Sequence, residues 1–466
     1  MSEPNPSGRL RRDLPFRRIA LILSGGGALG AYEVGVLKTF RAIGLRPAIV
    51  AGVSIGAVNA AVWVAHDFAT ATLERAWARM RPATIGLRWI TLAWRWLGVA
   101  IVVFAVAQLV LLLAGSRELS GAYWFWRKSS GRADVMSALL EAASWIVVGA
   151  LGVVALLLSR RAESWFARQS PVADPQRLHR RLGWALLGLV LVHVTVWILG
   201  WPWPHRFSAI ALIVMWVVWF ANRPGRTGDD LRRVLRGLLP ETGGRGLWTS
   251  AARRQVIEDL IGTGGGHLLE GDTTLVIGTL ALDSGAICHF VSPQGWTPGL
   301  GDKLAAQRAE VLPLRDPEDV VRAVLASSAI PGVFEPVRIA GRDLVDAGGF
   351  SNQPLHVAMA LEADALIAVL MTPSAGLPRR LPVSNLFDLA GRLLEIANWR
   401  DMQTELRQLP AGWTRDERPS RTCVVEPEGE LPGSVLEFAP ETAHALIARG
   451  ERDARLALER AGWLES

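Results

Sequence analysis

Four long apolar stretches interrupt the middle of the chain and constrain its fold more than any other feature. They lie at residues 90–114, 139–158, 182–200 and 207–221. The first and third are long enough for helices that cross a bilayer, which needs about 20 apolar residues, whereas the second contains Glu141 and the fourth is short. Their apolar character runs all round each helix, which favours membrane spans over buried helices of a soluble core. We therefore predict an insert of about four transmembrane helices.

Charges and tryptophans at the ends of these stretches predict how the insert is oriented. Arginine and lysine are more frequent before the first stretch, between the second and third, and after the fourth than in the other two loops. Basic residues mark the cytoplasmic side, and an even number of crossings returns both flanks to that side. Tryptophans near the ends of the first and third stretches fit an interfacial aromatic belt. The flanks are thus expected to form one cytoplasmic domain of a multi-pass protein in the inner or plasma membrane.

Composition narrows the expected partners. The formal net charge is +7, and arginines flank the apolar stretches without forming one long basic tract, a pattern that favours anionic lipid headgroups over nucleic acid. Cys288 and Cys423 lie far apart, which predicts neither a disulfide framework nor a thiolate metal site. Residues 1–17 contain arginines and prolines but no apolar core, so they predict a basic tail and not a secretory signal.

The hydrophobic pattern outside the insert predicts an α/β domain. Residues 18–23 and 48–52 are short apolar runs typical of buried strands, and residues 28–43 between them have helical spacing, which predicts a parallel strand–helix–strand unit. After the insert we expect helices at 250–261 and 318–327, a strand pair at 273–282 and 286–292, and a strand at 365–371. The tail from residue 382 predicts helices with solvated arginine-rich faces, notably 441–463, and no chemistry is expected there.

A serine sits at the junction between the second predicted strand and the helix that follows it. Gly52 and Gly56 flank Ser54 in the pattern G-x-S-x-G, which in this strand–helix context is typical of a nucleophile elbow. Small flanking residues let the backbone turn sharply, and the helix N-terminus favours negative charge at the serine. Ser54 is therefore the candidate nucleophile.

A nucleophilic serine needs a base, and the eight histidines offer none in a persuasive setting. His356 is the histidine closest to another candidate element and stays open as an alternative. That element is Asp346 with Ala347 and Gly348, an acid followed by small residues that could bring a carboxylate beside another loop. An aspartate in such a turn more often binds only its own backbone.

The glycines at residues 25–27 have two possible functions. Backbone N–H groups of Gly25, Gly26 and Gly27, unobstructed by side chains, could stabilise an oxyanion. Together with Gly30 they also satisfy the dinucleotide pattern G-x-G-x-x-G, which requires an acid at the end of the next strand. That strand ends instead at Ser54, so the oxyanion interpretation is favoured.

Taken together, the glycine loop at 25–30, the elbow at 52–56 and the acid motif at 346–348 resemble the patatin-like phospholipases. Residues 326–336 and 351–354 are similar to the same family. The resemblance covers roughly residues 18–86 and 250–370, and it implies a three-layer α/β/α sandwich with a Ser-Asp dyad, no histidine, no metal and no cofactor. It implies that Asp346 takes the proton of Ser54 and that Gly25, Gly26 and Gly27 form the oxyanion hole.

The hydrophobic pattern and the resemblance together give the expected domain boundaries. We expect a tail at 1–17, core segments at 18–88 and 222–381, the insert at 89–221 between them, and a helical C-terminal region at 382–466. Leu29 replaces the basic residue that many members carry, and Ala347 replaces a commoner glycine, so rate and substrate are left open. The expected activity is hydrolysis of membrane lipid esters.

Three other functions are weighed against this one. A catalytically silent membrane scaffold would explain the fold without explaining why both reacting groups are intact. A dinucleotide-binding protein lacks the acid described above. A transporter would need paired intramembrane acids or broken helices, and Arg95 and His193 support it only weakly.

Overall fold

The computed structural model describes residues 9–82, 84–87, 89–113, 145–153, 183–191, 246–248, 250–305, 309–377, 386–413 and 418–465. The chain divides into two compact units, one made of residues 1–86 and 242–466 and the other of residues 87–241.

The first unit is built on a mixed sheet of nine strands. Their order is β11-β10-β1-β2-β4-β5-β6, with β9 paired to β4 and β8 paired to β9. The bounds are β1 Ile19–Leu23, β2 Ile49–Val53, β4 Thr274–Ala281, β5 Ile287–Val291, β6 Ala309–Pro313, β8 Val337–Ile339, β9 Arg342–Asp346, β10 Ala365–Val369 and β11 Thr422–Val425. A separate parallel pair joins β3 Gly246–Trp248 to β7 Gly332–Phe334.

The strands β11, β10, β1, β2 and β4 are parallel to one another along this order, and β4 is antiparallel to β5 and β9. All five residues of β1, of β2 and of β10 are buried, as expected for parallel strands covered on both faces. Their continuous apolar sequence is thus explained by helices on either side. The predicted strand–helix–strand unit is confirmed as β1, α1 Ala31–Ala42 and β2.

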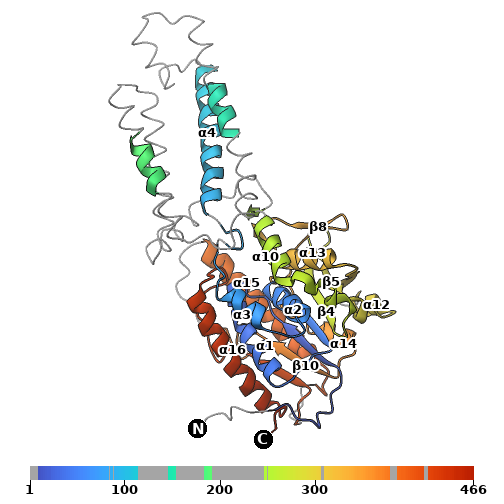
Figure 1. The fold of residues 1–466 in the computed structure, drawn as a ribbon. Helices are drawn as coiled ribbons and strands as arrows, with labels where there is room; N and C mark the ends of the chain where they lie inside the picture. Colours follow the sequence, from blue (N-terminus) through green and yellow to red (C-terminus); the bar gives the residue numbers. More distant parts are fainter. Residues whose placement is uncertain are drawn as a thin grey trace, which may run out of the picture. The chain divides into compact units, whose positions relative to one another are not determined.

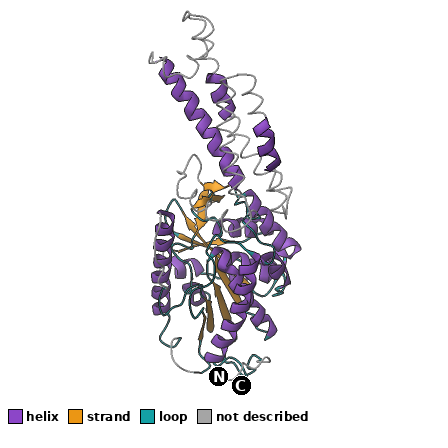
Figure 2. Cartoon of the chain, turned by 90° about the vertical axis from the view of Figure 1, so that its left-hand side faces the viewer, coloured by secondary structure: helices purple, strands orange, loops and turns teal. Residues whose placement is uncertain are grey.

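Helices cover both faces of the sheet (Figure 2). On one face α12 Leu300–Ala305, α14 His356–Ala360 and α15 Leu386–Gln408 share a core with β1, β2, β4 and β10. On the other, α2 Ile55–Ala65 and α13 Pro317–Ser327 contact β4. The remaining helical elements of this unit are η1 Gly27–Gly30, α3 Ala71–Trp77, α10 Ala251–Ile261, η2 Gly262–Gly265, α11 His267–Glu270, η3 Pro293–Gly295 and α16 Pro440–Arg460.

The C-terminal helix α16 lies beside α1 (Figure 1). A Cβ on Gly450 would lie 2.0 Å from the carbonyl oxygen of Tyr32, so only glycine lets the two backbones come this close. Tyr32 also donates to Asp453, and Lys38 pairs with Glu451. The helix predicted at 441–463 therefore forms, but its inner face is buried against α1 and is not solvated.

The register on β4 determines what lies beyond the end of β2. Val53, the last residue of β2, pairs with Gly278. The next residue of β4, Thr279, pairs with Asp346, the last residue of β9. At the same positions β5 pairs with the other edge of β4. β9 therefore pairs with the edge of β4 that β2 occupies up to Gly278. The residue after Val53 and the residue that ends β9 are thus brought together.

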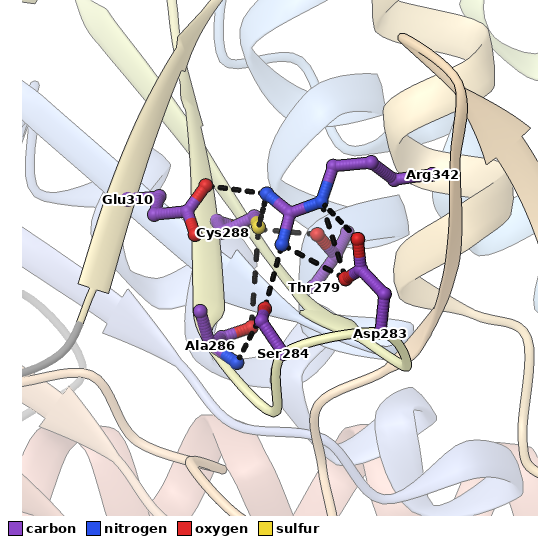
Figure 3. Close-up of polar contacts among 7 residues, drawn as sticks. All are labelled: Thr279, Asp283, Ser284, Ala286, Cys288, Glu310 and Arg342. Carbon is purple, nitrogen blue, oxygen red and sulfur yellow. Dashed lines mark hydrogen bonds and ion pairs between the residues drawn. The ribbon is translucent and has the colours of Figure 1, made fainter.

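The far end of β9 is tied to the sheet by Arg342, which begins that strand (Figure 3). Its guanidinium binds Asp283 and Ser284 of the turn between β4 and β5 and Glu310 of β6. It also donates to Cys288 Sγ at 3.8 Å, and burial raises the pKa of this thiol to about 11. Arg342 therefore fixes the strand that ends in Asp346 to three neighbouring segments.

The second unit contains α4 Trp89–Leu113, a helix of 25 residues over most of the first predicted span. Residues 145–153 and 183–191 are also helical and cover part of the second and third spans, and the fourth span lies outside the described residues. Within the described part of the chain, no helix combines the length and the apolar character that a bilayer crossing requires. Large apolar side chains of this unit are nevertheless exposed, among them Val103, Ile146, Leu151, Trp184 and Leu191.

Candidate active site

Ser54 stands at a sharp turn between β2 and α2. Its backbone has φ 56° and ψ −124°, a strained conformation for a residue with a side chain. A Cβ on Gly52 would lie 2.5 Å from the backbone of Gly56, and one on Gly56 would lie 2.4 Å from the carbonyl oxygen of Leu23. Both glycines of the G-x-S-x-G pattern are therefore required by close backbone contacts, and the turn has the geometry of a nucleophile elbow.

The side chains of Ser54 and Asp346 are in direct contact. Ser54 Oγ donates to Asp346 Oδ2 at 2.5 Å. Both residues are buried, with 6% and 4% of their surfaces exposed. The structure therefore brings the two predicted side chains together, and the β4 register explains why they meet.

The surroundings of the Asp346 carboxylate limit the rise in its pKa that burial causes. Burial raises its pKa from 3.8 to about 6, while hydrogen bonds from Ser54 and from the Gly348 backbone and the charge of Arg253 act in the opposite direction. The N–H of Gly348 donates to Asp346 Oδ1 at 2.7 Å. At neutral pH the carboxylate is mostly ionised and can accept a proton, as a general base requires.

Arg253 of α10 is a buried cation that sequence reasoning missed. It donates to the carbonyl oxygen and the hydroxyl of Ser328 and to Ser250 Oγ, and it lies over the Phe334 ring at 3.9 Å. Burial lowers the pKa of Arg253 to about 9, and the charge of Asp346 opposes this shift. Arg253 lies in helical register with the buried Ile257 and Ile261, and an arginine on such an apolar stripe was the available signal.

The glycine loop lies against the elbow, but its amides are not equivalent. Gly25 N donates to Asn352 Oδ1 at 2.9 Å, and Gly25 O accepts from Asn352 Nδ2 at 3.1 Å. The N–H groups of Gly26 and Gly27 have no acceptor among the described residues. Ala28 N donates to the carbonyl oxygen of Val435. Of the three predicted oxyanion donors, the Gly25 N–H is therefore already hydrogen-bonded to Asn352.

The backbone N–H of Ser54 is also hydrogen-bonded within the protein. Ser54 N donates to Ser327 Oγ at 2.8 Å, and that hydroxyl donates to the carbonyl oxygen of Gly278 at 2.7 Å. Ser327 belongs to the family-like stretch 326–336, but its spacing alone gave no sign of this bridge. The bridge joins the elbow to β4 and α13.

The other predicted motif residues lie close to the dyad. Gly30 O accepts from Asn59 Nδ2 at 2.9 Å, which ties the glycine loop to α2. Ala347 is fully buried and packs in a small cluster with Val53 and Val345, so its methyl group fills space under the elbow. Leu29 is buried.

His356, the open alternative for the base, is bonded elsewhere. Its Nδ1 lies 2.9 Å from Glu405 Oε1, and its Nε2 lies 3.1 Å from His289 Nε2. Both ring nitrogens are therefore taken by groups other than Ser54.

The fold and site together define an α/β protein with a serine–carboxylate pair at a nucleophile elbow. A sequence model of the family described as patatin-like phospholipase matches residues 21–137 and 215–359. The chain belongs to the patatin-like phospholipase family, which is a family of lipid hydrolases. The interval between the two matched segments falls within the predicted insert.

Individual relatives are similar over a short region. Neuropathy target esterase sws of Drosophila melanogaster is 39% identical over 84 residues, which is 17% of this chain and 6% of the relative. The same protein of Drosophila erecta gives the same identity and coverage. The chain thus aligns with only a small fraction of these relatives. The solved structure of VipD from Legionella pneumophila is 12% identical with a TM-score of 0.35, and covers 98% of this chain and 71% of that one.

Proposed function

We propose that the protein is a serine lipid acyl hydrolase in which Ser54 and Asp346 form a two-residue catalytic dyad. The observation that carries the proposal is the 2.5 Å hydrogen bond from Ser54 Oγ to Asp346 Oδ2 at a strained elbow. With His356 occupied by Glu405 and His289, the carboxylate is the base in reach of the serine. Such a dyad splits ester hydrolysis into acylation and deacylation.

In the first step Ser54 Oγ attacks the ester carbonyl carbon as Asp346 takes the hydroxyl proton. The tetrahedral intermediate then collapses, and Asp346 returns the proton to the leaving alcohol. In the second step a water molecule gives a proton to Asp346 and attacks the acyl-enzyme, which releases the fatty acid and restores Ser54. The pKa of Asp346, about 6, suits both directions of proton transfer near neutral pH.

The oxyanion would be stabilised by backbone donors close to Ser54. The N–H groups of Gly26 and Gly27 are the members of the predicted set without a protein acceptor among the described residues. The N-terminus of α2, which begins directly after Ser54, adds a favourable dipole. Donors aimed at a developing charge in a buried site each contribute about 3–4 kcal/mol to the rate in comparable enzymes.

A fluorophosphonate probe, which reacts with activated serines, tests this proposal. We expect the probe to label the wild-type protein and to leave Ser54→Ala unlabelled. Ser434→Ala removes an exposed hydroxyl and serves as the matched control, which should label normally. A panel of phospholipids, lysophospholipids and acylglycerols then identifies the substrate. Labelling of Ser54→Ala would move the nucleophile elsewhere, and a wild-type protein that does not react would favour a silent scaffold.

The lipid environment is part of the same proposal. We propose that the segment 89–221 anchors the enzyme in the inner or plasma membrane with its dyad on the cytoplasmic side. There an acyl chain can enter without full transfer to water, a transfer that costs about 0.8 kcal/mol per CH₂. Exposed apolar side chains of this segment, such as Trp184 at 72%, support lipid contact. Extraction of membranes with alkaline carbonate should leave the protein in the pellet, and its release into the supernatant would contradict the proposal.

A further inference from the structure

The carboxylate of Glu405, in helix α15, holds the first residue of α14 by two hydrogen bonds. Glu405 Oε2 accepts from the backbone N–H of His356 at 3.1 Å, and Oε1 lies 2.9 Å from His356 Nδ1. Only 12% of the Glu405 side chain and 5% of the His356 side chain are exposed. A buried charge that binds both the main chain and the ring of one residue fixes that residue strongly.

The opposite side of the His356 ring is fixed to the sheet. His356 Nε2 lies 3.1 Å from Nε2 of His289, a fully buried residue of β5. Because His356 Nδ1–H donates to Glu405, its Nε2 is the acceptor and His289 Nε2–H is the donor when both rings are neutral. His356 is thus held between α15 and β5.

A short segment, residues 350–356, connects this anchor to the turn that follows Asp346. We call it the strap. At its start the N–H groups of Phe350 and Ser351 donate to the carbonyl oxygen of Ala347, and at its end His356 is held as described. The strap is therefore anchored at both ends, next to the dyad and at α15.

Asn352, in the middle of the strap, holds the Gly25 peptide of the glycine loop. The side-chain amide makes both a bond to Gly25 N and a bond to Gly25 O, and Asn352 is 6% exposed. A Cβ on Gly25 would lie 2.4 Å from Asn352 Oδ1 and 2.9 Å from Ser54 Cβ. The peptide that Asn352 holds is thus in contact with the elbow serine.

We infer that Glu405 is a positioning residue for the proposed acyl transfer. Through His356 it fixes the position of the strap. The strap in turn fixes, through Asn352, the loop that carries the Gly26 and Gly27 amides. The inference rests on the proposed function. It gives α15 a part in the reaction although Glu405 does not touch the reacting atoms. Gly25 N–H then serves as a structural donor and not as an oxyanion donor.

A double-mutant cycle between Glu405 and Asn352 tests the inference, with hydrolysis of a soluble short-chain ester as the assay. A displaced loop costs transition-state stabilisation but not ground-state binding, so we expect Glu405→Ala and Asn352→Ala each to lower kcat about 10- to 100-fold with little change in KM. Because both act on one loop, the double variant should lose no more than the worse single variant. Glu405→Gln keeps one acceptor for the His356 N–H and should retain intermediate activity. Thr404→Ala, at an exposed neighbour on the same helix, should behave as wild type.

Two outcomes would overturn the inference. One is a Glu405→Ala protein that keeps the wild-type kcat. The other is a double variant whose loss equals the product of the two single losses. The unfolding midpoint of every variant is measured alongside, and if Glu405→Ala does not fold, Glu405→Gln takes its place in the cycle. Labelling of wild type at Ser54 keeps the proposed function intact even where the cycle fails, whereas absent labelling fails the proposed function itself.

Discussion

Two buried carboxylates flank the elbow, and they differ in what surrounds them. Asp346 lies on the β9 side and faces Ser54, whereas Glu33 of α1 lies on the side of the glycine loop. Glu33 is fully buried, and 4% of Asp346 is exposed. Burial is the largest cause of a raised pKa for both, so a difference in burial does not explain their different chemistry.

The difference lies in the donors and charges around each carboxylate. Asp346 receives the Ser54 hydroxyl and the Gly348 N–H and lies in the field of Arg253, and its pKa rises only to about 6. Glu33 receives an N–H from Asn59 and a backbone group of Ser24, no cation among the described residues acts on it, and its pKa is raised well above the ordinary value. A buried acid becomes a usable base only where hydrogen bonds and positive charge favour its ionised form.

The largest expected effect comes from a comparison in which each of the two acids is replaced by its amide. Asp346→Asn keeps the shape of the side chain but cannot take the Ser54 proton, so we expect kcat/KM for a soluble ester to fall about 1,000-fold or more. Glu33→Gln replaces a carboxyl group that binds Asn59 and whose neutral form is favoured by burial, so we expect activity within about twofold of wild type. A large loss of kcat/KM in Glu33→Gln, or a small one in Asp346→Asn, would contradict the proposed difference between the two acids.

Asp346→Asn should change stability in the direction opposite to activity. A folded-state pKa raised from 3.8 to about 6 means that Asp346 supports folding below about pH 4 and loses that contribution as the pH rises through 6. The loss is of order 3 kcal/mol at pH 8, so Asp346→Asn should raise the free energy of unfolding by roughly that amount at pH 8 and by little at pH 4.

Denaturant unfolding at the two pH values measures this effect. Glu33→Gln should also be more stable than wild type at high pH, because its folded-state pKa is raised in the same direction. Asp302→Asn, which neutralises an exposed acid, is the control and should show no such pH-dependent gain. An Asp346→Asn protein less stable than wild type at pH 8 would show that the donors around Asp346 more than offset the cost of burying its charge.

The sequence was sufficient for the elbow because its determinants are local. A buried strand, two small residues and a following helix, all within residues 49–65, define the position and conformation of Ser54. The partner of Ser54 is 292 positions away, and it could be named only because its own motif resembles one family. Its placement depends on which edge of β4 is free beyond Gly278, a property of strand pairing that composition and periodicity do not encode.

The supporting residues could not be predicted for a related reason. Arg253 and Glu405 lie in helices rich in charged residues, where a charged side chain more often faces solvent. Their burial follows from which face each helix turns toward the sheet and from partners such as Ser328 and His356 in distant segments. The short strands β8 and β9 are likewise defined by their pairing with each other and with β4, not by a long apolar run.

The smallest of the expected effects isolates the contribution of Arg253 to the difference between the two acids. Its positive charge lowers the pKa of Asp346, so Arg253→Met should raise that pKa and move the acidic limb of the pH profile of kcat/KM, near pH 6 in the wild type, to higher pH. The variant should recover most of its activity on the alkaline side, where Asp346 is ionised again. Arg254→Met removes the adjacent arginine, which pairs with the exposed Glu318, and should leave the limb in place. An unmoved limb in a folded Arg253→Met protein would leave the hydrogen bonds from Ser54 and Gly348 as the cause that limits the rise of the Asp346 pKa.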